Sequence, residues 1–338
     1  MSLFSIKRKY LASMFSKENV IGMGIGKKVS SNKRTGEDSI IVLVSRKKPR
    51  DQLSPHSLVP QTVDGVKTDV IEVGEIKALP KPKMTAKSAV NHTSKWRPAV
   101  GGISIGHKDI TAGTLGSIVY KDGEPYILSN NHVLANSNAA SIGDPVLQPA
   151  PYDGGKMDEQ IATLHSYVPI TFGVSGTSCP YAHTAEDIMN LITKLIKPNY
   201  EWELKKLNDG VNYVDCALAK PLYPGLLNNL ILEVGVIKGT AQAFIGMKVR
   251  KSGRTTGYTK GEVLVLDTTV TVDYGFGKAA VFENQIIAGA MSRGGDSGSL
   301  VLDENNNAVG LLFAGSDEVT ILNPIEHVTS ALGISLTL

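Results

Sequence analysis

Apolar and polar residues alternate over short distances in most of this chain. After residue 99, apolar segments such as Gly116–Tyr120, Pro125–Leu128 and Gly298–Leu302 are separated by turns rich in Gly, Asn and Asp. Short strands joined by tight turns are typical of antiparallel barrels or sandwiches. We therefore expect a mainly β region over residues 99–338.

The first 77 residues have a different pattern and predict a small α/β unit. We expect a helix over residues 4–16 and strands over Val20–Val29, Ser39–Val44 and Asp69–Val73. The turn-rich stretch Ser30–Gly36 fits a hairpin between the first two strands. Residues 78–98 combine prolines with basic residues and almost no apolar periodicity, which predicts a linker.

One segment interrupts the β pattern of the second region. Thr184-Ala-Glu-Asp187 has the form of a capping box, and apolar residues then recur three and four apart up to Pro198. This spacing predicts one apolar face of a helix. We expect residues 166–211 to form a partly helical insertion in the β region.

Composition narrows the class of protein. The chain is 42% hydrophobic and 20% charged, as expected for a globular protein, and no stretch approaches the ~18 apolar residues of a membrane span. The charged start, with Lys7, Arg8 and Lys9, predicts no secretion signal. We therefore expect a cytoplasmic location, no membrane partner, and free thiols at Cys179 and Cys216.

Charge is unevenly distributed along the chain. Residues 1–95 hold 18 basic and 8 acidic side chains, a net +10, and the remaining residues carry −7. The basic front could dock on the acidic body as a regulatory or inhibitory domain, or meet an acidic partner. The run Arg46–Arg50 has no aromatic residues for base stacking, so we expect no nucleic-acid partner.

The stretch Arg293-Gly-Gly-Asp-Ser-Gly-Ser299 is the strongest chemical signal. A serine between small residues on a tight turn is accessible to a substrate carbonyl. The backbone N–H groups of Gly295 and Ser297 could then bond the oxyanion. The alternative is a Gly/Ser-rich β-turn without chemistry.

A serine hydroxyl needs a base, and the base needs an orienting group. His132 follows an apolar strand, and Asp215 lies in the apolar stretch Asn212–Ala219, where a carboxylate needs a partner. The alternatives are a core or surface histidine and an edge-strand aspartate facing water. His56, His92 and His107 are interpreted as structural or surface residues. Asp153, Asp158 and Asp209 lie in looser, polar surroundings and rank below Asp215 as the orienting carboxylate.

The order His132, Asp215, Ser297 is the chymotrypsin order. With the stretches Ser129–Ala135, Val214–Ala219, Gly294–Val301 and Val309–Gly315, the region from residue 99 resembles the trypsin-like serine proteases of the chymotrypsin fold. Gly253-Arg-Thr-Thr-Gly257 and the small domain in front make it most similar to intracellular bacterial trypsin-like peptidases and the plant narrow-leaf type.

The resemblance implies two six-stranded β-barrels, at about residues 99–222 and 241–338, with the active site between them. Ser297 would be the nucleophile, His132 the general base and then acid, and Asp215 the orienting carboxylate, with the oxyanion hole at Gly295 and Ser297. Secreted members pair the acid next to the serine, here Asp296, with a freed N-terminus. Ala99 follows Arg97-Pro98, a poor bond for such cleavage, so another partner is open.

The resemblance also places a substrate pocket. Its residues would be Met291, Phe313, Ala314 and Gly315, which carry no charge and indicate apolar rather than Lys/Arg preference. Cys179, His183, His165 and Cys216 lack the spacing of a metal site, so we expect no metal and no organic cofactor.

The sequence thus predicts a serine endopeptidase acting on protein or peptide substrates and regulated by its N-terminal domain or a protein partner. The alternative is a latent or non-catalytic binding module with a protease fold.

Overall fold

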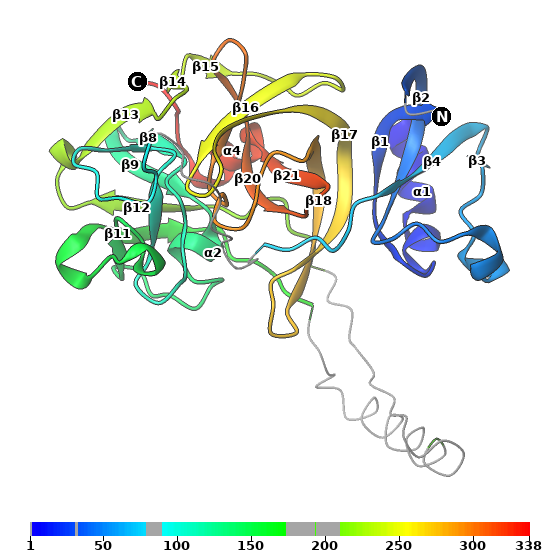
Figure 1. The fold of residues 1–338 in the computed structure, drawn as a ribbon, viewed down its shortest axis with the longest axis horizontal. Coiled ribbons are helices and arrows are strands. Elements are labelled where there is room, and N and C mark those ends of the chain that lie inside the picture. The colour runs from blue at the N-terminus through cyan, green and yellow to red at the C-terminus, as the bar shows by residue number, and fades with distance from the viewer. Residues whose placement is uncertain (1, 31–32, 79–89, 174–192, 194–209) are drawn as a thin grey trace.

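The protein is mainly β, as the sequence predicted. We describe a computed structural model, which defines residues 2–30, 33–78, 90–173, 193 and 210–338. Figure 1 shows a small N-terminal unit beside a larger body that consists mostly of strands. The predicted helical insertion falls largely on residues 174–192 and 194–209, outside the described residues.

The N-terminal unit has the predicted helix and strands. Ser2 accepts a hydrogen bond from the N–H of Ser5 and so begins the helix, whose buried Ile6 and Met14 pack in the core of the unit. The second strand is longer than predicted, because the hairpin ladder continues to the turn. The elements are α1 (Leu3–Phe15), β1 (Val20–Ser30), β2 (Lys33–Val44), β3 (Thr62–Val63) and β4 (Val66–Glu72), with short 3-10 turns at Arg50–Gln52 and Pro55–Ser57.

The sheet of this unit continues into the body. β1 pairs antiparallel with β17 (Gly257–Asp273), with Gly22 opposite Val270 and Gly26 opposite Val265. The glycine-rich stretch of β1 permits this close approach, because a Cβ on Gly24 would lie 2.5 Å from Val265 Cγ1. The predicted division at residues 77 and 99 stays a prediction, and residues 79–89 of the predicted linker lie outside the described residues.

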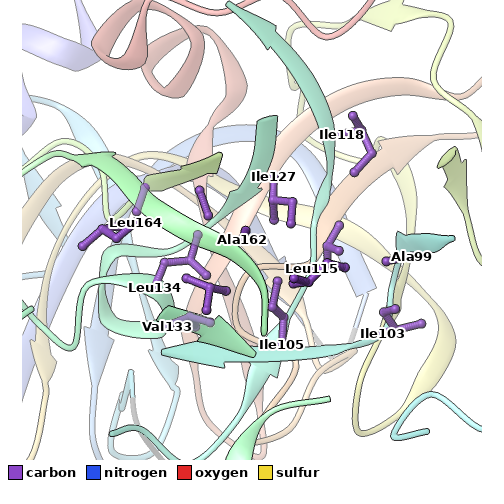
Figure 2. Close-up of a cluster of buried hydrophobic side chains, with 14 of the residues drawn as sticks. Ala99, Ile103, Ile105, Leu115, Ile118, Ile127, Val133, Leu134, Ala162 and Leu164 are labelled. Carbon is purple, nitrogen blue, oxygen red and sulfur yellow. The ribbon is translucent and has the colours of Figure 1, made fainter. Parts of the chain in front are cut away.

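The first sheet of the body has seven strands in the order β7-β6-β10-β11-β12-β9-β8. Some of its apolar side chains, including Ile105 and Ile127, pack with Leu115, which lies between β7 and β8, in one buried cluster (Figure 2). The seven strands of this sheet differ from the six that the resemblance implies for the first barrel. The strands are β6 (Ser104–His107), β7 (Gly113–Thr114), β8 (Ser117–Lys121), β9 (Glu124–Ser129), β10 (Pro145–Leu147), β11 (Gln160–Tyr167) and β12 (Ala217–Pro221).

Several shorter elements surround this sheet. α2 (Asn131–Leu134) follows β9 directly, and β5 (Ala99–Gly101), β13 (Leu227–Ile231) and β14 (Gly235–Val236) form a separate three-stranded sheet. Ala99 is fully buried in β5, beside β13. Short 3-10 turns lie at Pro151–Asp153, Met157–Glu159 and Pro224–Leu226.

The second sheet of the body closes into a six-stranded barrel. The order β16-β19-β20-β21-β18-β17 is completed by pairing between β16 and β17, as expected for the second barrel of the chymotrypsin-like architecture. The remaining elements are β15 (Gly239–Thr240), β16 (Lys248–Gly253), β18 (Ala279–Gly289), β19 (Leu300–Asp303), β20 (Asn307–Gly315), β21 (Val319–Pro324) and α4 (Ile325–Leu332).

Candidate active site

Strand pairing brings His132 and Asp215 together. β12 pairs antiparallel with β9, with Ala217 opposite Ser129, so the residues before β12 and after β9 meet at one end of the sheet. Asp215 Oδ2 lies 2.6 Å from Nδ1 of His132, and Asp215 Oδ1 accepts from the backbone N–H of His132 at 3.2 Å. Asp215 thus precedes the strand rather than lying within it, and it is fully buried.

Three further hydrogen bonds fix Asp215. The Tyr274 hydroxyl donates to Oδ2 at 2.8 Å, Asn130 Nδ2 donates to the backbone carbonyl, and Asn323 Oδ1 accepts from the backbone N–H. A buried carboxylate needs such partners, and they hold its position against the imidazole ring. The water-facing alternative for Asp215 is therefore wrong.

Tyr274 was not identified from the sequence. It follows β17, 59 residues beyond Asp215, and no local motif marks it. Burial, together with the negative charge and hydrogen bond of Asp215, raises the pKa of Tyr274 well above its ordinary value. The hydroxyl therefore keeps its proton and remains a donor to Asp215.

Ser297 lies on the tight turn between β18 and β19. Gly295 and Gly298 on either side have φ of +97° and +95°, which side-chain-bearing residues rarely adopt. A Cβ on Gly298 would lie 2.1 Å from Ser129 Oγ, so the turn packs directly against the end of β9. Thr114 N–H also donates to the Ser297 carbonyl at 2.8 Å.

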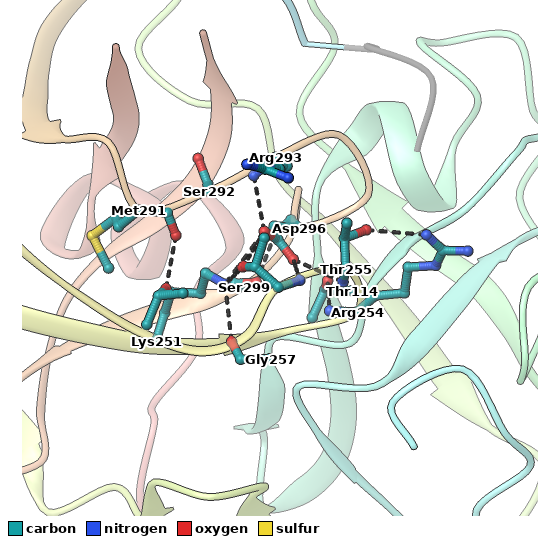
Figure 3. Close-up of polar contacts among 12 residues, drawn as sticks. Thr114, Lys251, Arg254, Thr255, Gly257, Met291, Ser292, Arg293, Asp296 and Ser299 are labelled. Carbon is teal, nitrogen blue, oxygen red and sulfur yellow. Dashed lines mark hydrogen bonds and ion pairs between the residues drawn. The ribbon is translucent and has the colours of Figure 1, made fainter. Parts of the chain in front are cut away.

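Asp296 has a partner within the chain (Figure 3). Its carboxylate accepts from the backbone N–H groups of Thr255, Thr256 and Arg293, and from the Thr256 hydroxyl at 2.6 Å. The buried Lys251 Nζ lies 3.3 Å from Oδ2. These contacts tie the Ser297 turn to the Gly253–Gly257 stretch.

Lys251 is a partner for Asp296, which the sequence had left open. Burial lowers the pKa of Lys251, while the neighbouring Asp296 opposes that shift. Ala99 lies in β5, and in the full chain its backbone nitrogen is bonded to Pro98 rather than free as a terminus. Asp296 is held by Lys251 and by backbone donors without a freed N-terminus.

The Ser297 hydroxyl donates to the backbone carbonyl of Ala78 at 3.3 Å. Within the described residues, no hydrogen bond joins this hydroxyl to His132, and the N–H groups of Gly295 and Ser297 have no acceptor. Two free donors beside a nucleophile suit a developing oxyanion. Acyl transfer would require this hydroxyl to leave Ala78 and to meet a base.

The four predicted pocket residues fall in two groups. Phe313 and Ala314 lie in one buried cluster, and Gly315 ends the same strand, β20. Met291 packs in a neighbouring cluster, with its sulfur 2.6 Å from where a Cβ on Gly261 would stand. Phe313, Ala314 and Gly315 thus form one strand edge, while Met291 fills space beside β17.

Three other titratable residues singled out in the sequence, His92, His107 and Asp153, have side-chain partners elsewhere in the fold. His92 lies 2.9 Å from Glu233, and His107 lies 3.1 Å from Asp144. Asp153 accepts from Arg254 Nε at 2.8 Å and from Ser104. His56 lies in a short 3-10 turn of the N-terminal unit, and Asp158 in another of the body.

Cys216, next to Asp215, is the cysteine that the structure describes. Cys216 is a free, buried thiol, and burial raises its pKa well above its ordinary value. Cys179, His183 and Asp209 lie outside the described residues, and among the described residues no three His, Cys, Asp or Glu side chains gather as metal ligands. No helix within the described ranges is long and apolar enough to span a membrane.

A cavity of about 660 Å³ lies away from these residues, in the N-terminal unit. Its lining includes Lys28, Arg46, Lys67 and Asp69. No histidine of the described residues lines it, so none of its hydroxyl groups is paired with an imidazole there.

No family model matches the chain. Among solved structures, a glutamic acid-specific serine protease is 20% identical, covers 71% of this chain and 100% of its own, and gives a TM-score of 0.45. Protease A of Thermobifida fusca is 17% identical; the match covers 70% of this chain and 96% of that protein, with a TM-score of 0.44. A chymotrypsin of Cellulomonas bogoriensis is also 17% identical; the match covers 70% of this chain and 97% of that protein, with a TM-score of 0.43. The function proposed below therefore rests on the residues themselves.

Proposed function

We propose that the chain is a serine endopeptidase with Ser297 as nucleophile, His132 as general base and Asp215 as orienting group. The observation that carries the proposal is the buried Asp215–His132 bond of 2.6 Å at the end of β9, against which the Ser297 turn packs. A buried acid bonded to an imidazole nitrogen fixes the tautomer that leaves the other nitrogen free to take a proton.

The proposed reaction follows from these positions. Ser297 Oγ attacks a peptide carbonyl carbon while its proton moves to Nε2 of His132, and the oxyanion accepts from the N–H groups of Gly295 and Ser297. His132 then gives the proton to the leaving amine as the C–N bond breaks. Water, deprotonated by His132, hydrolyses the acyl-enzyme and releases Ser297.

The substrate is an extended protein or peptide chain lying along Phe313, Ala314 and Gly315. The uncharged edge of β20 favours apolar over basic side chains. The similarity to intracellular bacterial trypsin-like peptidases and the plant narrow-leaf type, carried by Gly253–Gly257 and the front unit, is part of this proposal. So are the cytoplasmic location and regulation by the N-terminal unit or a protein partner.

The alternative of a latent or non-catalytic module has one observation in its favour. The Ser297 hydroxyl is bonded to Ala78 rather than to His132. This observation favours latency over loss of catalysis, because the groups that position His132 and the Ser297 turn are all present.

Labelling with a fluorophosphonate tests the proposal. The full chain should form one adduct, mapped to Ser297 by peptide mass spectrometry, because only an activated serine reacts quickly with this electrophile. Ser297→Ala should not react, His132→Ala should react at least 100-fold more slowly, and the surface control Ser141→Ala should match the wild type. Absence of an adduct at Ser297 after prolonged exposure would contradict the proposal.

A further inference from the structure

The chain leaving β4 does not run over the surface of the body. Residues 75–78 pass between the end of β17 and the end of β20, beside the Ser297 turn. Figure 1 shows this light-blue stretch running from the N-terminal unit to the centre of the body. It therefore lies where the proposed substrate would lie.

The backbone of this stretch pairs on both sides. Lys77 N–H donates to the Gly315 carbonyl at 3.0 Å, and Gly315 N–H donates to the Lys77 carbonyl at 3.1 Å. On the other side, Ala78 N–H donates to the Asp273 carbonyl, and Asp273 N–H donates to the Ile76 carbonyl, both at 3.0 Å. Such pairing is how an extended peptide adds to a strand edge.

Side chains alternate as they do in a bound peptide. Ile76 is 3% exposed and Ala78 is 1% exposed, and both pack in the apolar cluster that contains Phe313 and Ala314. The side chain of Lys77 points outward, is 42% exposed and pairs with Glu75. Ile76 thus places an aliphatic side chain against this cluster, and Ala78, two residues further on, places a methyl group there.

The last described residue of the stretch engages the nucleophile. The Ala78 carbonyl accepts a hydrogen bond from the Ser297 hydroxyl, whereas general-base catalysis requires that hydroxyl to donate to His132. No covalent change is needed for this effect. A substrate must displace the carbonyl, the strand pairing and the Ile76 side chain before Ser297 can react.

We propose that residues 75–78 are a built-in occupant of the substrate groove, which keeps the full chain latent and displays the side chains that an incoming peptide presents. This inference rests on the proposed function. Because the occupant is tethered to its site, it competes at an effective concentration of the order of millimolar. The preferred substrate has an aliphatic residue and, two positions further on, a small residue on the N-terminal side of the cut.

Ile76→Glu in the full chain tests the latency. A buried carboxylate beside Phe313 has no partner, so the stretch should leave the groove, and fluorophosphonate labelling of Ser297 should become at least 10-fold faster. The control Lys77→Ala removes only an exposed side chain and keeps the backbone bonds, so its rate should stay within about two-fold of wild type.

The outcomes separate this inference from the proposed function. Equal labelling rates at Ser297 in wild type and Ile76→Glu would contradict the proposal that residues 75–78 occupy the groove. The proposed peptidase activity would stand. No adduct in any chain would overturn the peptidase itself.

Hydrogen exchange on the wild-type chain needs no variant. Attachment of the probe to Ser297 must expel Ala78. The hydrogen-bonded amides of Lys77 and Ala78 should therefore exchange at least 10-fold faster in labelled protein, while those of β2 stay unchanged. Unchanged exchange at Lys77 and Ala78 would contradict the occupant.

Substrate profiling of Ile76→Glu with a mixed peptide library tests the displayed preference. Cleaved peptides should be enriched in an aliphatic residue and a small residue two positions later, before the cut. Enrichment in charged residues at both positions would overturn this part of the inference.

Discussion

At the scale of single residues, the candidate site depends on groups that hold its central residues in place. Asp215 accepts from His132 and Tyr274 at the same carboxylate oxygen, and Asp296 is surrounded by Lys251 and by donors from Thr255 and Thr256. A charge held by several short bonds cannot drift, which preserves the geometry that proton transfer needs.

Tyr274→Phe should slow the reaction without abolishing it. The substitution removes one hydrogen bond to a charged acceptor, worth about 1.5–3 kcal/mol, so kcat should fall roughly 10-fold or more. The rate of peptide hydrolysis at saturating substrate measures kcat, and Tyr223→Phe, at an exposed tyrosine, is the control. An unchanged kcat would show that the Tyr274 bond does not position Asp215.

Cys216 should make stability depend on alkaline pH. Its folded pKa is raised above 9.0, so between 9.0 and the folded pKa the unfolded chain releases a proton that the folded chain keeps. Stability therefore falls as pH rises through this window, by up to about 1.4 kcal/mol per pH unit for this group. The free energy of unfolding, measured with urea between pH 7 and 10.5, should fall more steeply with pH for wild type than for Cys216→Ala. Equal pH dependence of the two chains would contradict the assignment.

The sequence predicted residues with chemistry but not those that support them. Ser297, His132 and Asp215 stand in local motifs, and the structure places the last two 2.6 Å apart. Tyr274 and Lys251 reach the site only through the curvature of the second barrel, so no local pattern reveals them. Their roles depend on strand pairing over long separations.

At the scale of elements, strand pairing does most of the positioning. The β9–β12 ladder sets His132 against Asp215, and the β1–β17 ladder fixes the N-terminal unit to the second barrel. The sequence predicted β1 as a strand over Val20–Val29. Which strand β1 would approach depends on the exposed edge of a barrel that is remote in sequence.

Gly24→Val should weaken the β1–β17 pairing. Its side chain would collide with Val265 and Thr268, whose atoms lie 2.5 and 2.6 Å from the added Cβ, and overpacking of this kind costs about 1–3 kcal/mol. Gly36→Ala on β2 is the control, because nothing lies within 4 Å of its Cβ. Urea unfolding should show the loss for Gly24→Val alone, and equal stability of both variants would count against the pairing.

At the scale of the whole molecule, the front unit is joined to the body through a shared sheet. The sequence suggested attraction between a basic front and an acidic body. Among the described residues, Lys7 of the N-terminal unit pairs with Asp267 of the body at 3.0 Å. The β1–β17 hydrogen bonds and the stretch 75–78 add contacts that net charge does not predict. The spacing of short strands and turns predicted the mainly β class, and the resemblance implied the second barrel, whereas neither predicted this junction.

The junction should therefore resist salt. At 1 M salt the Debye length is about 3 Å, which screens exposed charges but leaves backbone pairing intact. Hydrogen exchange of amides in residues 22–26 and 265–270 should be the same at 0.1 and 1 M salt, to within about two-fold. Strong deprotection of both segments at high salt would instead support docking by net charge.

The central claim is that Ser297 hydrolyses peptide bonds in this chain. The most direct measurement is mass spectrometry of an unfolded protein substrate after incubation with wild type, Ile76→Glu, and each combined with Ser297→Ala. The account predicts new peptides with free termini from the Ile76→Glu chain, fewer from wild type, and none when Ser297 is replaced. The absence of Ser297-dependent peptides from both chains would contradict it.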